Sequence, residues 1–293
     1  QPWSGPQRGS TVVSVRGRGV LPGVLRCAFG ESEPSTAWSG GASRLRCESS
    51  ASAVIGWVGV QLSSFHGALS SGGSFYYHAE LRVSSVAPPL GPERGGTRVS
   101  VLGSGFKDAY TLRCRFDNSS SAVLARYVDE SQLECVSPVH APGSAAVLLS
   151  MNGQQYAPSG VSYTYQPSAS VRYVSPSFAL AEGGTPLTVH GSGFTSASES
   201  LGYLQCRLNG TVVRAELLAG GDSLVCASVA SWAGYVSVEV TSNGADFTSD
   251  GLQYESVWSV VSGVAPWSGP VTGGTLVSLS GTGLLASGLR CRF

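Results

Sequence analysis

The sequence predicts an all-β protein made of tandem β-sandwiches, and three observations lead to this prediction. One pattern, a glycine turn followed by a threonine, an alternating apolar run and a Gly-x-Gly break, occurs four times. Cysteines recur in pairs at nearly constant spacing. Short runs of alternating apolar and polar residues, separated by turn residues, are typical of strands with one buried face. We therefore expect repeated antiparallel sandwiches that stack as an extended rod.

The repeated pattern sets the expected module boundaries. It reads GSTVVSVRGRGV from Gly9, GGTRVSVLGSGF from Gly95, GGTPLTVHGSGF from Gly183 and GGTLVSLSGTGL from Gly273. Its threonines stand at positions 11, 97, 185 and 275. We expect module 1 over residues 1–80, module 2 over 81–167, module 3 over 168–256 and the N-terminal part of module 4 over 257–293.

Each module is expected to contain short strands bounded by turn residues. In module 2 we predict them at Leu81–Val86, Thr97–Val101, Leu112–Phe116, Ala122–Val128, Gln132–Val136, Ala145–Met151 and Val161–Tyr165. Module 1 has such runs at Thr11–Val15, Leu25–Phe29, Leu45–Cys47, Trp57–Leu62 and Ser74–Tyr77. Module 3 has them at Val171–Val174, Leu187–Val189, Leu204–Leu208, Ser223–Ala227, Tyr235–Thr241 and near Leu252–Tyr254. Module 4 has them at Val260–Val264, Thr275–Leu279 and Leu289–Phe293.

Two Asn-Gly pairs predict hairpin turns, because this dipeptide is the strongest short-range signal for one. Asn152-Gly153 and Asn243-Gly244 stand before the last expected strand of modules 2 and 3. Module 1 has Phe65-His66-Gly67 at that place instead.

Seven cysteines predict one disulfide in each complete module. Two fall in each module, at separations of 20, 21 and 20 residues, as Cys27 and Cys47, Cys114 and Cys135, and Cys206 and Cys226. Alternation places Cys114 on one strand face with Leu112 and Phe116, so its sulfur should point into the core. The rival interpretation is a set of buried free thiols in a cytosolic protein, but free thiols have no reason to recur in pairs at one spacing. We expect Cys291 to pair beyond Phe293.

The composition excludes some partners and favours others. Charged residues make up 12% of the chain, against about 25% in a typical soluble domain, and eighteen basic residues balance eighteen acidic ones. No basic field is present to hold nucleic acid, and no apolar run approaches the roughly 20 residues that span a bilayer. A serine- and glycine-rich surface with so little charge tends to self-associate, so we expect sugars or other subunits to cover it.

Two sequons predict N-linked sugar. Asn118-Ser119-Ser120 and Asn209-Gly210-Thr211 each lie three or four residues after the first cysteine of their module, in the same loop of successive modules. We expect covalent glycans at Asn118 and Asn209 and no other cofactor.

The chain has no recognisable catalytic or metal-binding motif. It contains no nucleophile elbow, P-loop, C-x-x-C, H-E-x-x-H or EF-hand loop. The glycine breaks at Gly103 and Gly191 precede a cysteine-bearing strand rather than a helix, which favours a turn over a phosphate site. The histidines, at positions 66, 78, 140 and 190, stand at unlike places in their modules. We therefore predict a protein that is not an enzyme and holds no metal.

Taken together, these motifs resemble the IPT/TIG family of immunoglobulin-like domains. Modules 2 and 3 carry the GGT strand, the Gly-x-Gly-Phe break, both cysteines and the Asn-Gly turn, whereas module 1 has Val20 in place of the phenylalanine and lacks that turn. The resemblance implies tandem immunoglobulin-like sandwiches. Members occur in plexin-type and growth-factor receptor ectodomains, fibrocystin-like ciliary surface proteins, Rel-type transcription factors and beside polysaccharide-cleaving enzymes, so it indicates the fold better than the function. Scattered arginines argue against the DNA-binding use.

Our first functional hypothesis is a non-catalytic, extracellular, glycosylated fibre or surface coat that assembles by self-association, with other extracellular glycoproteins as further partners. A flagellar hair, or mastigoneme, at the ciliary surface is the candidate assembly. Pro2–Pro6 recurs as Pro266–Pro270, which suggests a three-module super-repeat in a longer chain, with chance similarity as the alternative. The tryptophans considered for contacts between subunits or modules, with core burial as the alternative, are Trp3, Trp38, Trp232, Trp258 and Trp267.

Two other hypotheses remain open from the sequence. The modules could form the stalk of a cell-surface receptor or adhesin, which a distinct head domain and a transmembrane segment in the full-length protein would favour. They could also be an accessory region of a secreted enzyme that acts on polysaccharides, which a neighbouring catalytic domain would indicate.

Overall fold

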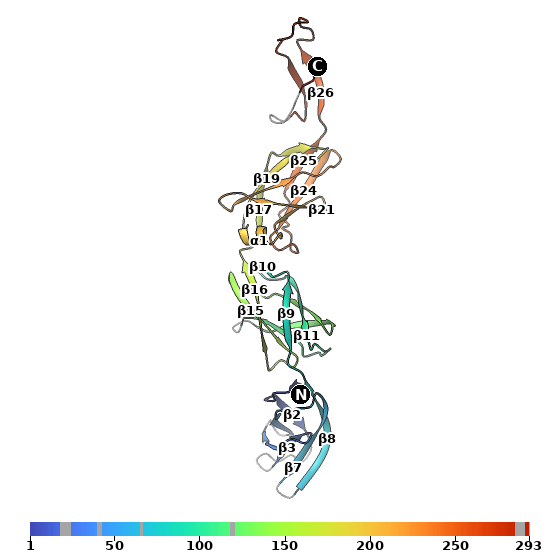
Figure 1. Cartoon of the computed structure of the whole chain (residues 1–293), viewed down its shortest axis with the longest axis vertical. Coiled ribbons are helices and arrows are strands. Elements are labelled where there is room, and N and C mark those ends of the chain that lie inside the picture. The colour runs from blue at the N-terminus through green and yellow to red at the C-terminus, as the bar shows by residue number, and fades with distance from the viewer. Residues whose placement is uncertain (18–24, 40–42, 65–66, 118–120, 285–290, 293) are drawn as a thin grey trace. The chain divides into compact units, whose positions relative to one another are not determined.

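A computed structural model describes residues 1–17, 25–39, 43–64, 67–117, 121–284 and 291–292 (Figure 1). These residues form two compact units, one of residues 1–89 with 94–165 and the other of residues 90–93 with 166–293. Nearly all residues of modules 1 and 2 thus belong to the first unit. Strands dominate the described residues, as the alternating sequence predicts.

Module 1 is a sandwich of two sheets with strand orders β1-β8-β7-β3-β4 and β2-β6-β5. Its strands are β1 (Ser4–Pro6), β2 (Val12–Arg16), β3 (Arg26–Phe29), β4 (Ser35–Thr36), β5 (Trp38–Ser39), β6 (Arg44–Glu48), β7 (Gly56–Ser64) and β8 (Gly67–His78). The core lies between the sheets, where Phe75 packs edge to face against both Phe29 and Tyr77. The last strand runs well beyond the predicted Ser74–Tyr77 and pairs with β7 along its length.

Module 2 follows the predicted strand plan closely. Its strands are β9 (Arg82–Ala87), β10 (Leu90–Pro92), β11 (Arg98–Ser104), β12 (Arg113–Phe116), β13 (Val123–Asp129), β14 (Gln132–Val136), β15 (Gly143–Ser150) and β16 (Ala157–Gln166). β13 pairs with β12 in one layer and with β14 in the other, so the strand order β10-β16-β15-β12-β13-β14-β11-β9 is continuous. In β11, Val99 and Val101 are buried while Arg98 and Leu102 are exposed, which is the alternation that the sequence shows.

Module 3 has two sheets, with strand orders β17-β19-β23-β22 and β18-β25-β24-β20-β21. Its strands are β17 (Ser170–Ser175), β18 (Phe178–Leu180), β19 (Pro186–Ser192), β20 (Gln205–Leu208), β21 (Thr211–Arg214), β22 (Glu216–Leu217), β23 (Ser223–Ala227), β24 (Gly234–Thr241) and β25 (Gln253–Val257). A short helix that the alternation did not predict, α1 (Ser196–Ser200), begins at the cap residue Thr195, whose hydroxyl accepts from the Ser198 amide at 3.2 Å.

In module 4, β26 (Val260–Ala265) and β27 (Ser278–Thr282) form an antiparallel pair. β27 begins three residues later than the start of the predicted strand at Thr275. The predicted strand Leu289–Phe293 falls largely outside the described residues, as do Asn118, Val20 and the pair Phe65-His66.

Near the start of modules 1 and 3, a short strand pairs in parallel and so departs from the purely antiparallel plan. In module 3, β17 pairs with β19 in one sheet, and after Pro176 the chain continues as β18, which pairs in parallel with β25 in the other sheet. β1 pairs in parallel with β8 in the same way. Proline has no N–H for a ladder, so it ends pairing with the first sheet and lets the chain pass to the second.

The Asn-Gly pairs predicted as hairpin turns lie within longer loops. In module 2 the last pair of the β15–β16 ladder is Leu149 with Ala157, so Asn152 and Gly153 belong to a loop of residues 151–156. In module 3 the loop after β24 runs over residues 242–252. The Asn-Gly pair that does form a two-residue hairpin turn is Asn209-Gly210, between the paired residues Leu208 and Thr211. Its residues have φ of 45° and 90°, the positive values that a type I′ turn requires.

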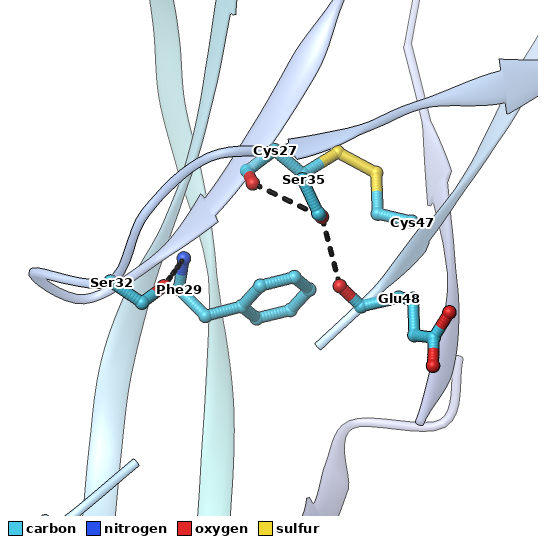
Figure 2. Close-up of a disulfide and its surroundings, with 6 residues drawn as sticks. All are labelled: Cys27, Phe29, Ser32, Ser35, Cys47 and Glu48. Atoms are coloured by element: carbon cyan, nitrogen blue, oxygen red, sulfur yellow. Dashed lines mark hydrogen bonds between the residues drawn. A yellow bond between two sulfur atoms is a disulfide. The ribbon is translucent and has the colours of Figure 1, made fainter. Parts of the chain in front are cut away.

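Each complete module contains one disulfide between its two sheets. Cys27–Cys47, Cys114–Cys135 and Cys206–Cys226 have Cα–Cα distances of 6.1, 6.4 and 6.4 Å, and all six residues are at most 1% exposed. Figure 2 shows the first of them, where the Ser35 hydroxyl lies within hydrogen-bond distance of the carbonyl oxygens of Cys27 (3.3 Å) and Glu48 (2.9 Å). One short side chain therefore connects the two strands that the disulfide joins.

In each of the three complete modules, the backbone N–H of the motif threonine donates to a serine two residues after the second cysteine. The Thr11, Thr97 and Thr185 amides donate to the hydroxyls of Ser49 (3.1 Å), Ser137 (3.2 Å) and Ser228 (2.9 Å). Our sequence interpretation missed this contact, although the signal was there, because Cys-x-Ser occurs at the second cysteine of all three modules.

Candidate functional site: the junction between modules 1 and 2

The residues that the sequence singled out do not converge on one reactive centre. The six core cysteines are joined in three separate modules, and Cys291 is exposed and free. Asn209 is exposed at its turn. Over the described ranges, no three His, Cys, Asp or Glu side chains gather as a metal site would need. The surfaces of the modules and the junctions between them are therefore the candidate functional sites.

An extensive polar contact joins the loop 151–156 of module 2 to strand β2 of module 1. β2 is an edge strand, since its sheet runs β2-β6-β5, and an edge strand presents unpaired backbone groups. The Gln154 side chain satisfies two of them. The Val12 N–H donates to Gln154 Oε1 at 2.9 Å, and Gln154 Nε2 donates to the Val12 carbonyl at 2.9 Å. The amide thus imitates one residue of a neighbouring strand.

Gln155 binds the two residues that precede Val12. Its Nε2 donates to the Ser10 carbonyl, and its Oε1 lies 3.1 Å from the Thr11 hydroxyl, which acts as the donor. Thr11 is fully buried and is held by Ser49 within its own module. Gln155 is therefore hydrogen-bonded to a residue of module 1 whose own position is held by a further hydrogen bond within that module.

Asn152 positions both glutamines. Its Oδ1 accepts from the backbone N–H groups of Gln154 at 2.9 Å and Gln155 at 3.1 Å, so it closes the loop as an Asx turn. Its Nδ2 donates to Gln155 Oε1 at 2.6 Å and to the Ser4 carbonyl of module 1 at 3.1 Å. Because this side chain is only 5% exposed, removing it would leave buried polar groups without partners.

The same asparagine in module 3 closes its own loop in a similar way. Asn243 Oδ1 accepts from the amides of Ala245 at 3.0 Å and Asp246 at 2.8 Å. The residues that correspond to Gln154 and Gln155 are therefore an alanine and an aspartate. The Asx turn is thus common to both modules, while the pair of glutamines belongs to module 2.

An apolar contact accompanies these hydrogen bonds. Trp3 of module 1 stacks on Trp57, with ring centroids 5.5 Å apart and an interplanar angle of 19°, and also packs against the core of module 2. The sequence left open whether Trp3 is a contact residue or a core residue. The structure places it half-buried at the junction, whereas Trp232 and Trp267 are 87% and 91% exposed.

Replacing Gln154 and Gln155 together by alanine is expected to loosen the junction without unfolding either sandwich. The two side chains make four hydrogen bonds to module 1, each with a net contribution of about 0.5–1.5 kcal/mol, so the loss should be about 2–6 kcal/mol. Hydrogen exchange measured by NMR should show faster exchange of the Val12 amide, because Gln154 is its acceptor.

Gln205→Ala provides the matched control, since the Gln205 amide bonds to the Gly202 carbonyl within its own module. That variant should leave exchange of the Val12 amide unchanged. Unchanged exchange in the double glutamine variant would show that the junction does not depend on these amides.

The burial of His78 predicts that the stability of the first unit depends on pH. It ends β8 close to the junction and is 5% exposed, and its Nδ1 lies 2.8 Å from the Ala79 carbonyl. Burial lowers the pKa of His78 below its ordinary value of 6.5 and outweighs the opposing effects of the Ala79 carbonyl and the Glu80 carboxylate. The folded protein therefore holds the neutral imidazole. We expect stability to be full above pH 6.5 and to decline as the pH falls through the lowered pKa, because the unfolded chain then binds the extra proton.

Chemical denaturation between pH 7.5 and 5 measures this effect. The variant His78→Gln should show a smaller decline in the free energy of unfolding over that range. An equal decline in both proteins would contradict the assignment to His78.

No helix among the described residues has the length and apolar character to cross a membrane. Three buried disulfides indicate a chain that folds in an oxidising, extracellular compartment, because such bonds are rare in the cytosol.

Comparison with known proteins identifies relatives of this chain. Plexin-A3 of Rattus norvegicus is 24% identical over 217 residues, which are 68% of this chain and 11% of that protein. Fibrocystin-L of Homo sapiens is 27% identical over 176 residues, which are 59% of this chain and 4% of that protein. The chain therefore spans a small part of these relatives. Among solved structures, the full extracellular region of plexin A4 matches 80% of this chain and 20% of its own, with 18% identity and a TM-score of 0.44.

A match to a protein-family model identifies the family of this chain. The model described as the IPT/TIG domain matches residues 81–165 and 169–256, which carry the second and third cysteine pairs. These two ranges cover more than half of the sequence. The chain therefore belongs to the IPT/TIG domain family.

Proposed function

We propose that this chain is a stalk segment of a longer extracellular protein, a receptor or adhesin, in which it holds other parts at a set distance and orientation. The observation that carries the proposal is the junction at β2. Asn152, Gln154 and Gln155 connect module 2 to the backbone of module 1, and Trp3 adds an apolar contact. A linker that served only as a flexible tether would not need such a set of contacts.

The relatives support this proposal over a filament. Plexin-A3 and fibrocystin-L are both far longer than this chain, so in each the matching segment is a small part of a large protein. A spacing role agrees with that arrangement, since repeat modules contact only their neighbours and transmit orientation along the array.

Residual dipolar couplings measured by NMR test the stalk proposal directly. If modules 1 and 2 are rigidly coupled, their backbone amides will fit one alignment tensor. In the Gln154→Ala, Gln155→Ala variant they should require two tensors. If the unmodified chain already requires two independent tensors, the junction does not set orientation and the proposal fails.

A fibre or surface coat, such as a mastigoneme filament at a ciliary surface, is the second candidate. The low charged fraction of 12% favours it, because a surface with little charge promotes self-association. Sedimentation velocity of the glycosylated chain over a range of concentrations separates the two candidates. Reversible assembly would favour the fibre, and a single monomeric species at all concentrations would favour the stalk.

A further inference from the structure

Trp232 and Tyr235 form an exposed aromatic pair on module 3. Their side chains are 87% and 75% exposed, on either side of the point where β24 begins at Gly234. Counted from the second cysteine, module 2 has Ala141 and Ser144 at the corresponding positions. The IPT/TIG fold therefore does not require aromatic residues here, and their exposure needs a separate explanation.

A groove beside this pair also reaches the predicted sequon of module 3. The groove has a volume of about 340 Å³, and its lining includes Asn209 and Thr211 together with Trp232 and Tyr235. This volume is at the lower end of the roughly 300–1,000 Å³ found for small-ligand sites. None of the described lining residues is charged, which suits a neutral ligand better than an anion or a cation. The acceptor asparagine and the aromatic rings thus border one uncharged surface.

The strand register explains why they meet. Leu208 pairs with Val238, so Asn209 stands beside Ser237, and its N–H donates to the Ser237 carbonyl at 3.2 Å. Val236 and Val238 are buried, so Ser237 and Tyr235 share the outward face of β24. Two residues along a strand span about 7 Å. Tyr235 is therefore only two strand positions from the residue that lies beside Asn209, and both Tyr235 and Asn209 line the groove.

The turn presents Asn209 outward. Asn209 and Gly210 are the two central residues of the β20–β21 hairpin, and Asn209, Gly210 and Thr211 are all exposed. A sugar joined to Asn209 Nδ2 would therefore start at the surface, at the edge of the groove.

We propose that an N-linked glycan on Asn209 folds back over Trp232 and Tyr235, so that its first sugars occupy the groove. The C–H groups on one face of a pyranose ring carry a small positive charge, and the face of an aromatic ring is negative, so the two faces attract while apolar area leaves water. In the transfer itself, a bond forms between Asn209 Nδ2 and C1 of the first sugar. The bond from C1 to the diphosphate of a lipid-linked donor breaks, the diphosphate leaves with the electron pair of that bond, and the proton of the amide nitrogen is released to solvent. The inference goes beyond a stalk function and shares with it only the extracellular location.

Oxidative footprinting by mass spectrometry tests the proposal residue by residue. The whole chain is secreted from a host that adds N-glycans, and Thr211→Ala, which removes the sequon but keeps Asn209, is produced alongside it. We expect hydroxyl radicals to oxidise Trp232 severalfold more slowly in the glycosylated chain than in the Thr211→Ala chain. Trp267, which is 91% exposed, is the internal reference and should react equally in both. Ser120→Ala, which removes only the other sequon, should leave Trp232 as slow as in the unmodified chain.

The unfolding temperature of the chain provides a second test of the proposal. The glycosylated chain should unfold at a higher temperature than Thr211→Ala, and that difference should disappear when Trp232→Ala and Tyr235→Ser are present in both. These two changes introduce small residues of the kind that module 2 has at the same positions, so the sandwich is expected to tolerate them.

Three results would overturn the proposal. If Asn209 carries no glycan in the secreted chain, no sugar is present to occupy the groove. Equal oxidation of Trp232 in the two chains would show a glycan that points away from the aromatic pair. Protection of Trp232 in Thr211→Ala that grows with protein concentration would show that a second copy of the chain covers the pair instead. Failure of the stalk proposal appears elsewhere, in the dipolar couplings of modules 1 and 2, and leaves these measurements unaffected.

Discussion

Replacing Cys114 and Cys135 together by alanine is expected to lower the free energy of unfolding of module 2 by about 3 kcal/mol. The disulfide closes a loop of 21 residues, and without it the unfolded chain gains the conformational freedom that the cross-link had removed. A loss of this size is a large share of the 5–15 kcal/mol that typically stabilises a domain. Hydrogen exchange followed by mass spectrometry measures it locally, through faster exchange of the peptides that carry β12 and β14.

Module 3 serves as the control within the same molecule. Its disulfide between Cys206 and Cys226 closes a loop of nearly the same length, and the double alanine variant in module 2 should leave its exchange unchanged. The corresponding variant of Cys206 and Cys226 should reverse the pattern. If neither variant accelerates exchange in its own module, the disulfides contribute little to stability and the modules are held by their apolar cores alone.

Replacing Gly95 by alanine is expected to destabilise module 2 by about 3 kcal/mol or more, from backbone strain together with steric overlap. Gly95 has a φ of 69°, and a Cβ atom added there would lie 2.5 Å from the carbonyl carbon of Pro138. The atoms that this Cβ would meet, in Ser137 and Pro138, belong to the backbone, so they cannot move aside as a flexible side chain would. The loss should appear as a lower denaturant midpoint for module 2, measured on the whole chain by exchange of the β11 and β14 amides.

The neighbouring glycine separates the two causes. Gly96 has a φ of 90°, but a Cβ atom there would meet no other atom within 4 Å. Gly96→Ala should therefore cost only the strain of the left-handed backbone, about 1–2 kcal/mol. Equal losses at the two positions would show that the close approach to Pro138 is relieved by movement of the backbone. Gly183 and Gly184 repeat the same contrast in module 3, where Gly183 faces the backbone of residues 228–230.

The local structure of each sandwich was predictable because neighbouring residues carry the signal. The alternation of Val99 and Val101 with polar residues places β11 with one face in the core, and the recurrent cysteine spacing indicates disulfides that the structure places inside each core. Strand ends generally agree to within one to four residues in module 2. These features depend on side-chain direction within single strands, which alternates at every residue whatever the rest of the chain does.

The Asn-Gly dipeptides show where local signals end. Asn209-Gly210 forms the two-residue turn, while Asn152-Gly153 and Asn243-Gly244 lie in longer loops, although all three offer the same backbone freedom. The difference lies in the flanking strands. Leu208 and Thr211 pair directly, whereas the β15–β16 ladder ends at Leu149 and Ala157, too far apart for a tight turn. Register between strands decides the turn, and register depends on which faces are buried.

The candidate site was beyond the reach of sequence patterns for a related reason. Gln154 and Val12 are 142 residues apart, and nothing in either segment specifies the other. The contact exists because β2 is an edge strand with free backbone groups and because Asn152 holds the loop in a shape that presents two amides to it. The sequence could propose Trp3 as a contact residue but could not distinguish its place from that of the exposed Trp232.

By itself, the amino-acid sequence determined the fold class and the tandem IPT/TIG character of the chain, and it predicted the order of the modules and the pairing of the core cysteines. Only the tertiary structure decided which loop faces which strand edge, which tryptophan is covered and which asparagine stands beside an aromatic groove. The physical reason is the distance along the chain over which each kind of signal acts. Periodicity and spacing act between residues that are close in the chain, whereas a junction or a groove arises from surfaces that folding brings together from distant segments.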